Sequence, residues 1–334
     1  MRLTQNLILA VISFFYLTTT LTSCQNDHVE LINITLTKEI NQLSDSTYLG
    51  DIAEIKKLGN DIFALDRKNR RLIVLDHNLQ IKNSIGSSGK GPGEFISPNR
   101  FTFYDNNLWI FDGANLRFSC FDFKGHFQIS HKADDPLTEL CSFFGKNDKL
   151  YYMAPKDLYK YSTCNITNGA IKSFYQNNDS DVDLVNMAHC DKYETWFRVN
   201  QELPVIEVFN KGDEIIKKID LPVTWFNRLN FTPKAVKESP QNTKRLLIQN
   251  ICCDRNHLYL MYIDHSQDYT KTHCNKIIQL KISDTGIPLI SEYKLIKLLD
   301  NWYTSFCVSG NEITAFNSTN GVLEQYKIIE NEKN

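Results

Sequence analysis

Residues 61–82 read DIFALDRKNRRLIVLDHNLQIK, and residues 107–128 repeat the pattern without a gap as NLWIFDGANLRFSCFDFKGHFQ. The alignment places Asp66 on Asp112, Asn69 on Asn115, Arg71 on Arg117 and Asp76 on Asp122. Each copy is an apolar strand, a polar turn, a second alternating strand, another turn and the start of a third strand. Repeats of ~40–50 residues built from short strands are typical of the blades of a β-propeller.

The same pattern continues along the chain and predicts six blades. Blade 1 covers residues 50–85, blade 2 residues 100–131, blade 3 the region after Leu150, blade 4 residues 194–221, blade 5 residues 258–293 and blade 6 residues 312–329. Blade 6 is one strand short, whereas Val29–Leu36 alternates as a strand with no partner nearby. We therefore predict an all-β fold: a six-bladed β-propeller over residues 29–334, closed by the N-terminal strand in the last blade.

Composition narrows the class of protein further. The formal net charge of the 334 residues is −2, so the chain lacks the basic surface that nucleic-acid binding requires. The chain is rich in aromatic residues, with 20 Phe and 15 Tyr, which favours strands. A closed ring of repeats also accommodates this length as one domain.

The N-terminus carries a targeting pattern. An apolar run from Leu7 to Leu17 is long enough for the core of a signal peptide and too short to span a bilayer. Leu21-Thr22-Ser23-Cys24 follows it and resembles the lipobox of bacterial lipoproteins. We therefore predict a signal peptide over residues 1–23, lipidation of Cys24, a tether over residues 24–28 and a protein held at the bacterial cell envelope by its lipid alone. The alternative is an ordinary signal peptide with an incidental cysteine.

A glycine-rich loop, IGSSGKGPGEF at residues 85–95, separates the first two blades. Its G-x-x-G-x-G-P-G-E-F pattern resembles the six-bladed β-propeller lipoproteins of Bacteroidetes-type bacteria, which are relatives of NHL-repeat propellers. That resemblance implies a six-bladed propeller on a lipid anchor and brings no common activity with it. The loop could also bind phosphate near Lys90, but no helix pattern follows it, so we predict a tight crossover with Phe95 packed between the blades.

The repeated aspartates suggest a structural role rather than a catalytic one. A catalytic group needs to occur once, whereas Asp66 and Asp112 recur at equivalent places. Asp and Asn side chains stabilise turns by bonding to nearby backbone. We predict that role for these residues.

The cysteines form a second pattern. CDKYETWF at residue 190 aligns with CDRNHLYL at residue 253, which places both cysteines on innermost strands. Cys190, Cys253 and Cys307, with His189, Asp191 and Asp254, are therefore candidates to converge near the axis. Three alternatives stay open: a zinc or copper site, a disulfide, or small buried hydrophobic residues. No C-x-x-C or H-x-x-x-H spacing occurs, and adjacent residues point to opposite faces of a strand, so we predict no metal and no cofactor.

Residues 222–244 do not fit the repeat, and connections of this length are usually functional or disordered. Trp225, Phe226, Arg228 and Phe231 make the segment aromatic and cationic, which suits stacking on a sugar or clamping a peptide. We predict a short helix from Thr232 and place the first candidate binding site here. The alternative is a lid that merely covers one end of the ring.

Two functions follow from the predicted architecture. The first is a binding module of the cell envelope that recognises an envelope protein, a peptide or a glycan through loops gathered at one face. The second is a hydrolase or lyase acting on glycans or peptides from the mouth of the ring. The chain contains no G-x-S-x-G or H-E-x-x-H motif, which favours binding over catalysis. The enzyme hypothesis predicts that five polar residues meet at one pocket: Arg100, His189, Asp191, Asp254 and Arg255.

Overall fold

The computed structural model describes residues 30–133, 143–153, 160–175, 185–200, 205–212, 214–222, 248–265 and 272–329. The chain divides into two compact units, Met1–Glu30 and Leu31–Asn334, and the fold described below is that of the second unit. None of the helices in the described ranges is long and apolar enough to cross a membrane. Cys24, the predicted signal peptide and the aromatic segment after Pro222 lie outside the described residues.

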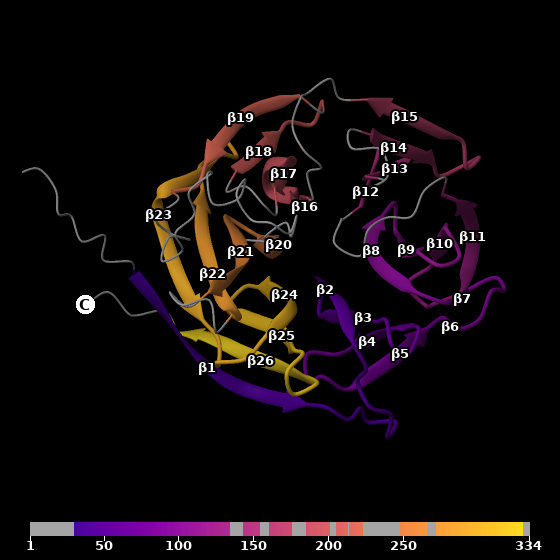
Figure 1. The fold of residues 1–334 in the computed structure, drawn as a ribbon, viewed down its shortest axis with the longest axis horizontal. Helices are drawn as coiled ribbons and strands as arrows, with labels where there is room; N and C mark the ends of the chain where they lie inside the picture. Colours follow the sequence, from indigo (N-terminus) through magenta and orange to yellow (C-terminus); the bar gives the residue numbers. More distant parts are fainter. Residues whose placement is uncertain are drawn as a thin grey trace, which may run out of the picture. The chain divides into compact units, whose positions relative to one another are not determined.

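Short antiparallel sheets follow one another around a common centre in chain order, with the first strand of each innermost (Figure 1). Blade 1 contains β2 (Ile52–Leu58), β3 (Asp61–Asp66), β4 (Arg71–Leu75) and β5 (Ile81–Ile85). Blade 2 contains β8 (Pro98–Tyr104), β9 (Asn107–Asp112), β10 (Arg117–Phe121) and β11 (Phe127–Lys132). Blade 3 contains β12 (Phe144–Lys146), β13 (Lys149–Met153), β14 (Lys160–Asn165) and β15 (Ile171–Tyr175).

The second half of the ring has the same plan. Blade 4 contains β16 (Val185–Cys190), β17 (Thr195–Asn200), β18 (Val205–Phe209) and β19 (Ile215–Asp220). Blade 5 contains β20 (Ile248–Asp254), β21 (His257–His265), β22 (Thr272–Ile282) and β23 (Pro288–Lys297). Blade 6 contains β24 (Tyr303–Ser309), β25 (Glu312–Asn317) and β26 (Val322–Ile329), and β1 (Glu30–Ile40) completes it. The predicted six-bladed propeller is confirmed.

The N-terminal strand closes the ring as predicted. β1 runs antiparallel to β26, with Asn33 opposite Ile329 and Ile40 opposite Leu323. Thr37 Oγ1 also donates to the carbonyl oxygen of Gln325 at 2.9 Å. The strand continues four residues beyond the predicted end at Leu36. Its other edge bonds to β23, so blades 5 and 6 join into one eight-stranded sheet, which the sequence did not predict.

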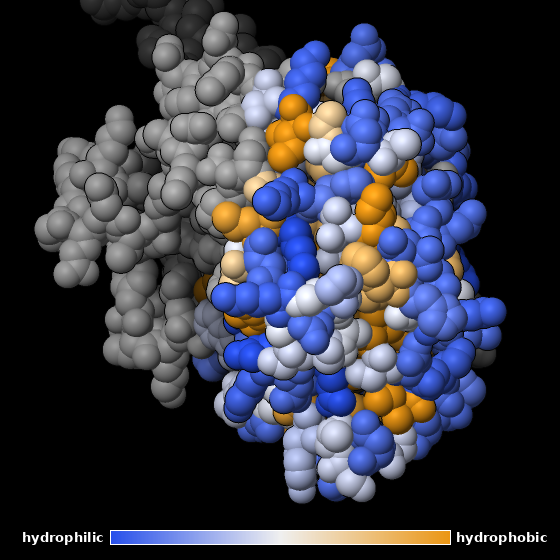
Figure 2. Space-filling view, turned by 90° about the vertical axis from the view of Figure 1, so that its right-hand side faces the viewer, coloured by the Kyte–Doolittle hydropathy of each residue, from blue (hydrophilic) through white to orange (hydrophobic). Residues whose placement is uncertain are grey.

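The apolar faces of the sheets are buried between neighbouring blades. Blades 1 and 2 share one such cluster, in which Phe63, Leu72, Phe101 and Ile110 meet. Polar contacts add to this packing, since the carboxylate of Glu54 accepts from the backbone N–H of Phe101 at 2.7 Å. Hydrophilic residues cover most of the described face drawn in Figure 2, where hydrophobic residues lie in small separate groups.

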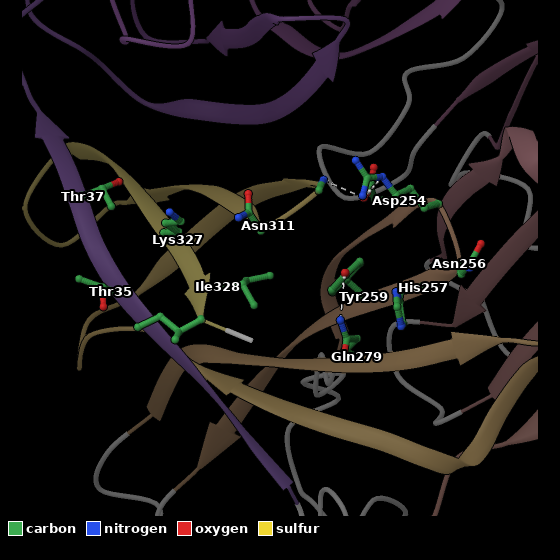
Figure 3. Close-up of a pocket in the computed structure, with 13 residues that line it drawn as sticks. Thr35, Thr37, Asp254, Asn256, His257, Tyr259, Gln279, Asn311, Lys327 and Ile328 are labelled. Atoms are coloured by element: carbon green, nitrogen blue, oxygen red, sulfur yellow. Dashed lines mark hydrogen bonds and ion pairs between the residues drawn. The ribbon is translucent and has the colours of Figure 1, made fainter. Parts of the chain in front are cut away.

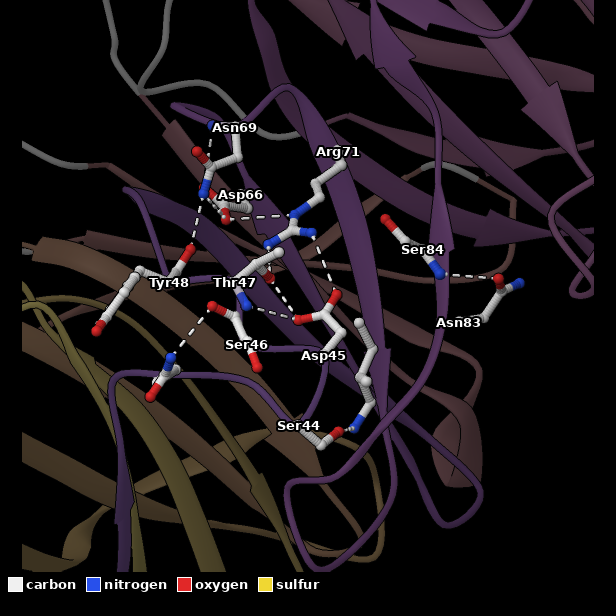
Figure 4. A network of polar contacts seen from close by, with 12 residues as sticks. Ser44, Asp45, Ser46, Thr47, Tyr48, Asp66, Asn69, Arg71, Asn83 and Ser84 are labelled. Carbon is white, nitrogen blue, oxygen red and sulfur yellow. Dashed lines mark hydrogen bonds and ion pairs between the residues drawn. The ribbon is translucent and has the colours of Figure 1, made fainter.

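The repeated aspartates fix the connections between blades, as predicted. Asp66 is fully buried, and its carboxylate accepts from the side-chain amide of Asn69 at 2.7 Å and the backbone N–H of Gly50 at 3.3 Å (Figure 4). Asp112 accepts from the backbone N–H groups of Ile96 and Ser97, both at 2.9 Å. Each aspartate therefore ties the incoming connection to the second strand of its blade. In blade 6 the backbone N–H of Asn320 donates to Asn317 Oδ1 at 3.2 Å, as the N–H of Asn69 donates to Asp66 Oδ1 in blade 1.

The glycine-rich loop is the predicted crossover between blades. Short strands β6 (Ser87–Ser88) and β7 (Glu94–Phe95) pair in parallel, and Phe95 is fully buried in the cluster between blades 1 and 2. The Glu94 carboxylate accepts from the backbone N–H of Gly91 at 2.7 Å. The chain's own carboxylate thus takes the position that an anion would need, which argues against the phosphate alternative.

Candidate functional site

A pocket of about 890 Å³ lies between blades 5 and 6. Blade 5 supplies the turn between β20 and β21, together with residues of β21 and β22, and blade 6 supplies the turn between β24 and β25, with residues of β26 and β1 (Figure 3). The lining residues are Thr35, Thr37, Asp254, Arg255, Asn256, His257, Tyr259, Gln279, Gly310, Asn311, Lys327, Ile328 and Ile329. A volume of this size lies within the range of ~300–1,000 Å³ that is usual for small-molecule sites.

The two turns are tied together at the rim. The Asp254 carboxylate accepts from the backbone N–H of Gly310 at 2.9 Å, and the Arg255 Nε atom lies 4.0 Å from the same carboxylate. Gly310 has φ +62°, and a Cβ there would lie 3.3 Å from the Arg255 guanidinium. The left-handed backbone conformation therefore favours glycine at this turn, whereas the exposed end of Arg255 could move away from a Cβ.

The lining is rich in hydrogen-bond donors and carries an excess of positive charge. Arg255 and Lys327 are both exposed, and Asp254 is the one carboxylate among the lining residues. That carboxylate already accepts a hydrogen bond from the backbone N–H of Gly310. The side chain of Arg255 is 77% exposed, so its guanidinium is available to a ligand.

Two polar lining residues, Tyr259 and His257, are partly or almost fully buried. Tyr259 is almost fully buried, and its hydroxyl accepts from Gln279 Nε2 at 3.1 Å. Burial raises the pKa of Tyr259, so the phenol stays protonated and can donate. Burial also lowers the pKa of His257, with help from Lys281 and Lys294 and against the effect of Asp254. The imidazole is therefore neutral at pH 7.

Of the residues predicted from sequence, Asp254 and Arg255 line this pocket and Arg100 does not. Arg100 is buried, and its guanidinium donates to the carbonyl oxygens of Ala53 at 3.2 Å and Asn99 at 3.1 Å. It lies four residues before the end of β8, whereas Asp254 ends β20. Arg100 ties blade 2 to blade 1.

His189 also lies elsewhere. Its ring packs on Trp196 with centroids 4.3 Å apart, and Phe144 of blade 3 contacts the same indole at 4.1 Å. The predicted inner strand ends at Cys190, and Asp191 belongs to the 3-10 turn η1 (Asp191–Tyr193) rather than to a strand. The side chain of Asp191 and the segment with Trp225, Phe226, Arg228 and Phe231 lie outside the described residues.

The inner-strand cysteines do come close together. Cys190 and Cys253 form a side-chain hydrogen bond, and both lie on innermost strands as predicted. The seven cysteines in the described part of the chain are free thiols. Within those ranges no group of three or more His, Cys, Asp or Glu side chains could hold a metal ion.

Sequence reasoning missed most of the pocket. Lys327 and Thr35 belong to predicted strands, and Thr37 lies just beyond the predicted end of the N-terminal strand at Leu36. Their position opposite blade 5 follows from the pairing of β1 with β26. In an alternating strand, the polar residues between the apolar ones point away from the core, and this pattern could have identified them. Asn256 and His257 directly follow the flagged pair Asp254-Arg255, and extending that motif would have included them.

The fold and the pocket define a six-bladed β-propeller with a polar site between two blades. The profile of the family DUF5128, described as 6-bladed beta-propeller, matches residues 42–276. The chain belongs to this family. No curated protein matches the sequence.

Solved structures share the fold at low sequence identity. One, described as an exported protein of Bacteroides fragilis, has a TM-score of 0.58 at 14% identity, covering 89% of this chain and 96% of its own. A DUF4221 family member from Bacteroides vulgatus has a TM-score of 0.59 at 12% identity, covering 90% and 99%. Virginiamycin B lyase from Staphylococcus aureus has a TM-score of 0.53 at 10% identity, covering 89% and 100%.

Proposed function

We propose that this protein is a lipid-anchored binding module of the bacterial cell envelope that takes a small anionic ligand in the pocket between blades 5 and 6. The observation that carries the proposal is the charge of the pocket lining: Arg255 and Lys327 outnumber its one carboxylate, Asp254, which already accepts a hydrogen bond from a backbone amide and lies 4.0 Å from Arg255 Nε. Cationic side chains with free donors bind carboxylates through charge-assisted hydrogen bonds.

The remaining lining suits a ligand that also carries hydroxyl groups. Asn256, Asn311 and Gln279 offer side-chain amides, and Thr35 and Thr37 offer hydroxyls. Amides and hydroxyls donate and accept hydrogen bonds, which matches the groups of a sugar ring. An acidic sugar or a short oligosaccharide containing one is therefore the ligand class that we propose.

Two observations support the location. The Leu21–Cys24 pattern precedes the propeller at the place where a lipoprotein is cleaved and acylated. One structural relative with the same fold is described as exported. Palmitate labelling in the native host tests the anchor. Labelling of the wild type that is lost in Cys24→Ala supports lipidation at Cys24, and labelling that persists in Cys24→Ala contradicts it.

Titration calorimetry tests the ligand class. Glucuronate- and galacturonate-containing oligosaccharides are titrated against neutral glucose and galactose oligosaccharides of equal length. Binding of the acidic members alone supports the proposal, and equal binding of both sets contradicts it. Arg255→Ala and Lys327→Ala should each weaken binding by about 5- to 30-fold, because each removes one exposed charge-assisted hydrogen bond of about 1–2 kcal/mol. Lys82→Ala is the matched control, since Lys82 pairs with Asp61 in blade 1 and should leave affinity unchanged.

An elimination activity on the same ligand is a second candidate, favoured by one observation. His257 is neutral at pH 7 and lines the pocket that holds Arg255, so it can accept a proton while the guanidinium neutralises a carboxylate. An unsaturated product from acidic oligosaccharides, seen by ultraviolet absorbance and lost in His257→Gln, would support this activity. Binding without any product would leave the protein a binding module.

A further inference from the structure

Cys190 and Cys253 lie at matching heights on neighbouring innermost strands. The side-chain amide of Asn186 in β16 donates to the carbonyl oxygen of Ile248 in β20 at 3.3 Å, which places these two residues side by side. Cys190 follows four residues after the first and Cys253 five residues after the second. A register shift between Ile248 and Asn250 takes up the extra residue. The two cysteines therefore meet where the strands end.

The two thiols are in contact, and one of them also contacts the pocket rim. The Cys253 thiol donates to the Cys190 sulfur, and Cys190 Sγ bonds to the carbonyl oxygen of Arg255 at 3.3 Å. The hydrogen bond from Cys253 lowers the pKa of Cys190, against the effect of burial and with help from the backbone amides of Tyr193 and Lys192 and the charge of His189. Cys190 is 2% exposed, whereas Cys253 is partly exposed.

The turn that follows Cys190 holds the turn that follows Cys253. Lys192 Nζ donates to Asn256 Oδ1 at 2.6 Å, and the Tyr193 hydroxyl donates to the same atom at 3.4 Å. Arg255 has φ +50°, a left-handed conformation that non-glycine residues rarely adopt and that surrounding contacts must maintain. The contact between Cys190 and the Arg255 carbonyl is one of those contacts.

We propose that Cys190 and Cys253 form a reversible redox pair, oxidised to a disulfide by an external disulfide, and that oxidation loosens the Arg255–Asn256 turn and weakens ligand binding in the pocket. The disulfide itself follows from the position of the thiols. Its effect on ligand binding rests on the function proposed above.

The reaction is thiol–disulfide exchange in two steps. The thiol pair first loses a proton to solvent, and the charge rests mainly on Cys190, whose pKa is lowered while that of Cys253 is raised. Transfer of the remaining proton along the shared hydrogen bond to Cys190 gives a minor form in which the partly exposed Cys253 sulfur is the thiolate, and this form reacts. That thiolate attacks one sulfur of the external disulfide, breaks its S–S bond and forms a mixed disulfide, and the released thiolate takes up a proton. Cys190 then loses its proton and attacks the Cys253 sulfur, which expels the second thiolate. Two cysteine thiols are oxidised by two electrons, and one external disulfide is reduced to two thiols.

Oxidation changes the pocket rim because it consumes the hydrogen of Cys190. The disulfide has no S–H group, so the Arg255 carbonyl oxygen loses that donor. A left-handed residue with one contact fewer is held less firmly, and the Arg255 guanidinium is then less well positioned for an anion. The reduced protein is the form that binds.

Peptide mapping by mass spectrometry tests the disulfide. The full mature chain is treated with oxidised glutathione, digested without reduction and compared with a sample reduced beforehand. A peptide containing Cys190 linked to one containing Cys253 is the expected result. A free Cys190–Cys253 pair after treatment, or a link from either residue to another cysteine, would overturn the proposal. Cys253→Ala should abolish the link, whereas Cys252→Ser, one residue away on the other face of β20, should retain it.

Limited trypsin digestion tests the effect on the turn without any ligand. Trypsin cleaves after Arg255, and we expect this cleavage to be about fivefold faster in the oxidised protein, because a loosened turn exposes its backbone more often. Equal rates in the two redox states, with the disulfide shown to be present, would overturn the coupling while leaving the proposed function intact. Faster cleavage in the oxidised protein, with no acidic ligand bound in either redox state, would contradict the proposed function but support the coupling between the disulfide and the turn.

Discussion

The carboxylate of Asp254 and the backbone N–H of Gly310 are joined by a hydrogen bond of 2.9 Å that spans from blade 5 to blade 6 at the rim of the pocket. Asp254→Ala should lower the free energy of unfolding by about 1–2 kcal/mol, since a charge-assisted bond is lost at a partly exposed site. Urea unfolding measures this change. Asp254→Asn keeps an acceptor oxygen and should cost less than half as much; equal losses for both variants would contradict the assigned role.

The crossover loop predicts a contrast between two glycines. Gly86 has φ +85°, and a Cβ there would lie 2.1 Å from Phe95 Cε2, whereas Gly321 has φ +67° with nothing within 4 Å. Gly86→Ala should therefore destabilise the protein by about 3 kcal/mol, from strain plus overpacking, and Gly321→Ala by about 1 kcal/mol from strain alone. Thermal and urea unfolding measure both. Similar losses at the two positions would show that Phe95 is not held against the loop.

Ring closure by β1 predicts complementation in trans. A chain that begins after Ile40 leaves the edges of both β23 and β26 unpaired, so its cooperative unfolding transition should be lost or strongly lowered. A synthetic peptide of residues 28–41 should restore the transition, as followed by circular dichroism. A control peptide with Ile32→Asp and Ile34→Asp should fail, because both isoleucines pack against the core between blades 5 and 6. An unaffected truncated protein would contradict the closure.

His257 predicts a pH dependence of stability with a defined sign. Its pKa is lowered in the folded protein, mainly by burial, and returns to about 6.5 in the unfolded chain. Between these two values the unfolded state binds more protons, so the free energy of unfolding should fall as pH decreases below about 6.5. His257→Gln should lose part of this decrease relative to the wild type. Identical pH profiles, measured by urea unfolding from pH 7.5 to 5, would show that the imidazole is not shielded.

The propeller was predictable because its repeat is local. Asp66 and Asp112 close turns within a few residues of themselves. Blade 6 is one strand short after Val322–Ile329, and the alternating segment Val29–Leu36 has no partner nearby, which predicts the closure. The predicted ends of strands were wrong where the backbone changes conformation. The cysteine alignment predicts Asp191 beside Cys190 on a strand, yet a 3-10 turn begins at Asp191 because the chain must reverse before β17.

The pocket was only partly predictable because it forms between blades. The cysteine alignment pointed to Asp254 and Arg255, which lie on a turn at the rim. It also pointed to His189, which packs on Trp196. Arg100, which the enzyme hypothesis places in the same pocket, bonds to backbone carbonyls instead. A charged residue in a sequence shows that a partner is needed, and only the packing of the blades decides whether that partner is the protein itself or a ligand.

The most direct measurement is a crystal structure of the protein with the acidic oligosaccharide that binds most tightly. We expect the carboxylate of the ligand to lie between Arg255 and Lys327, within about 4 Å of both cations, with sugar hydroxyls bonded to Asn256, Asn311 or Gln279. A ligand bound at any other face of the ring, with the pocket between blades 5 and 6 filled only by water, would contradict the account.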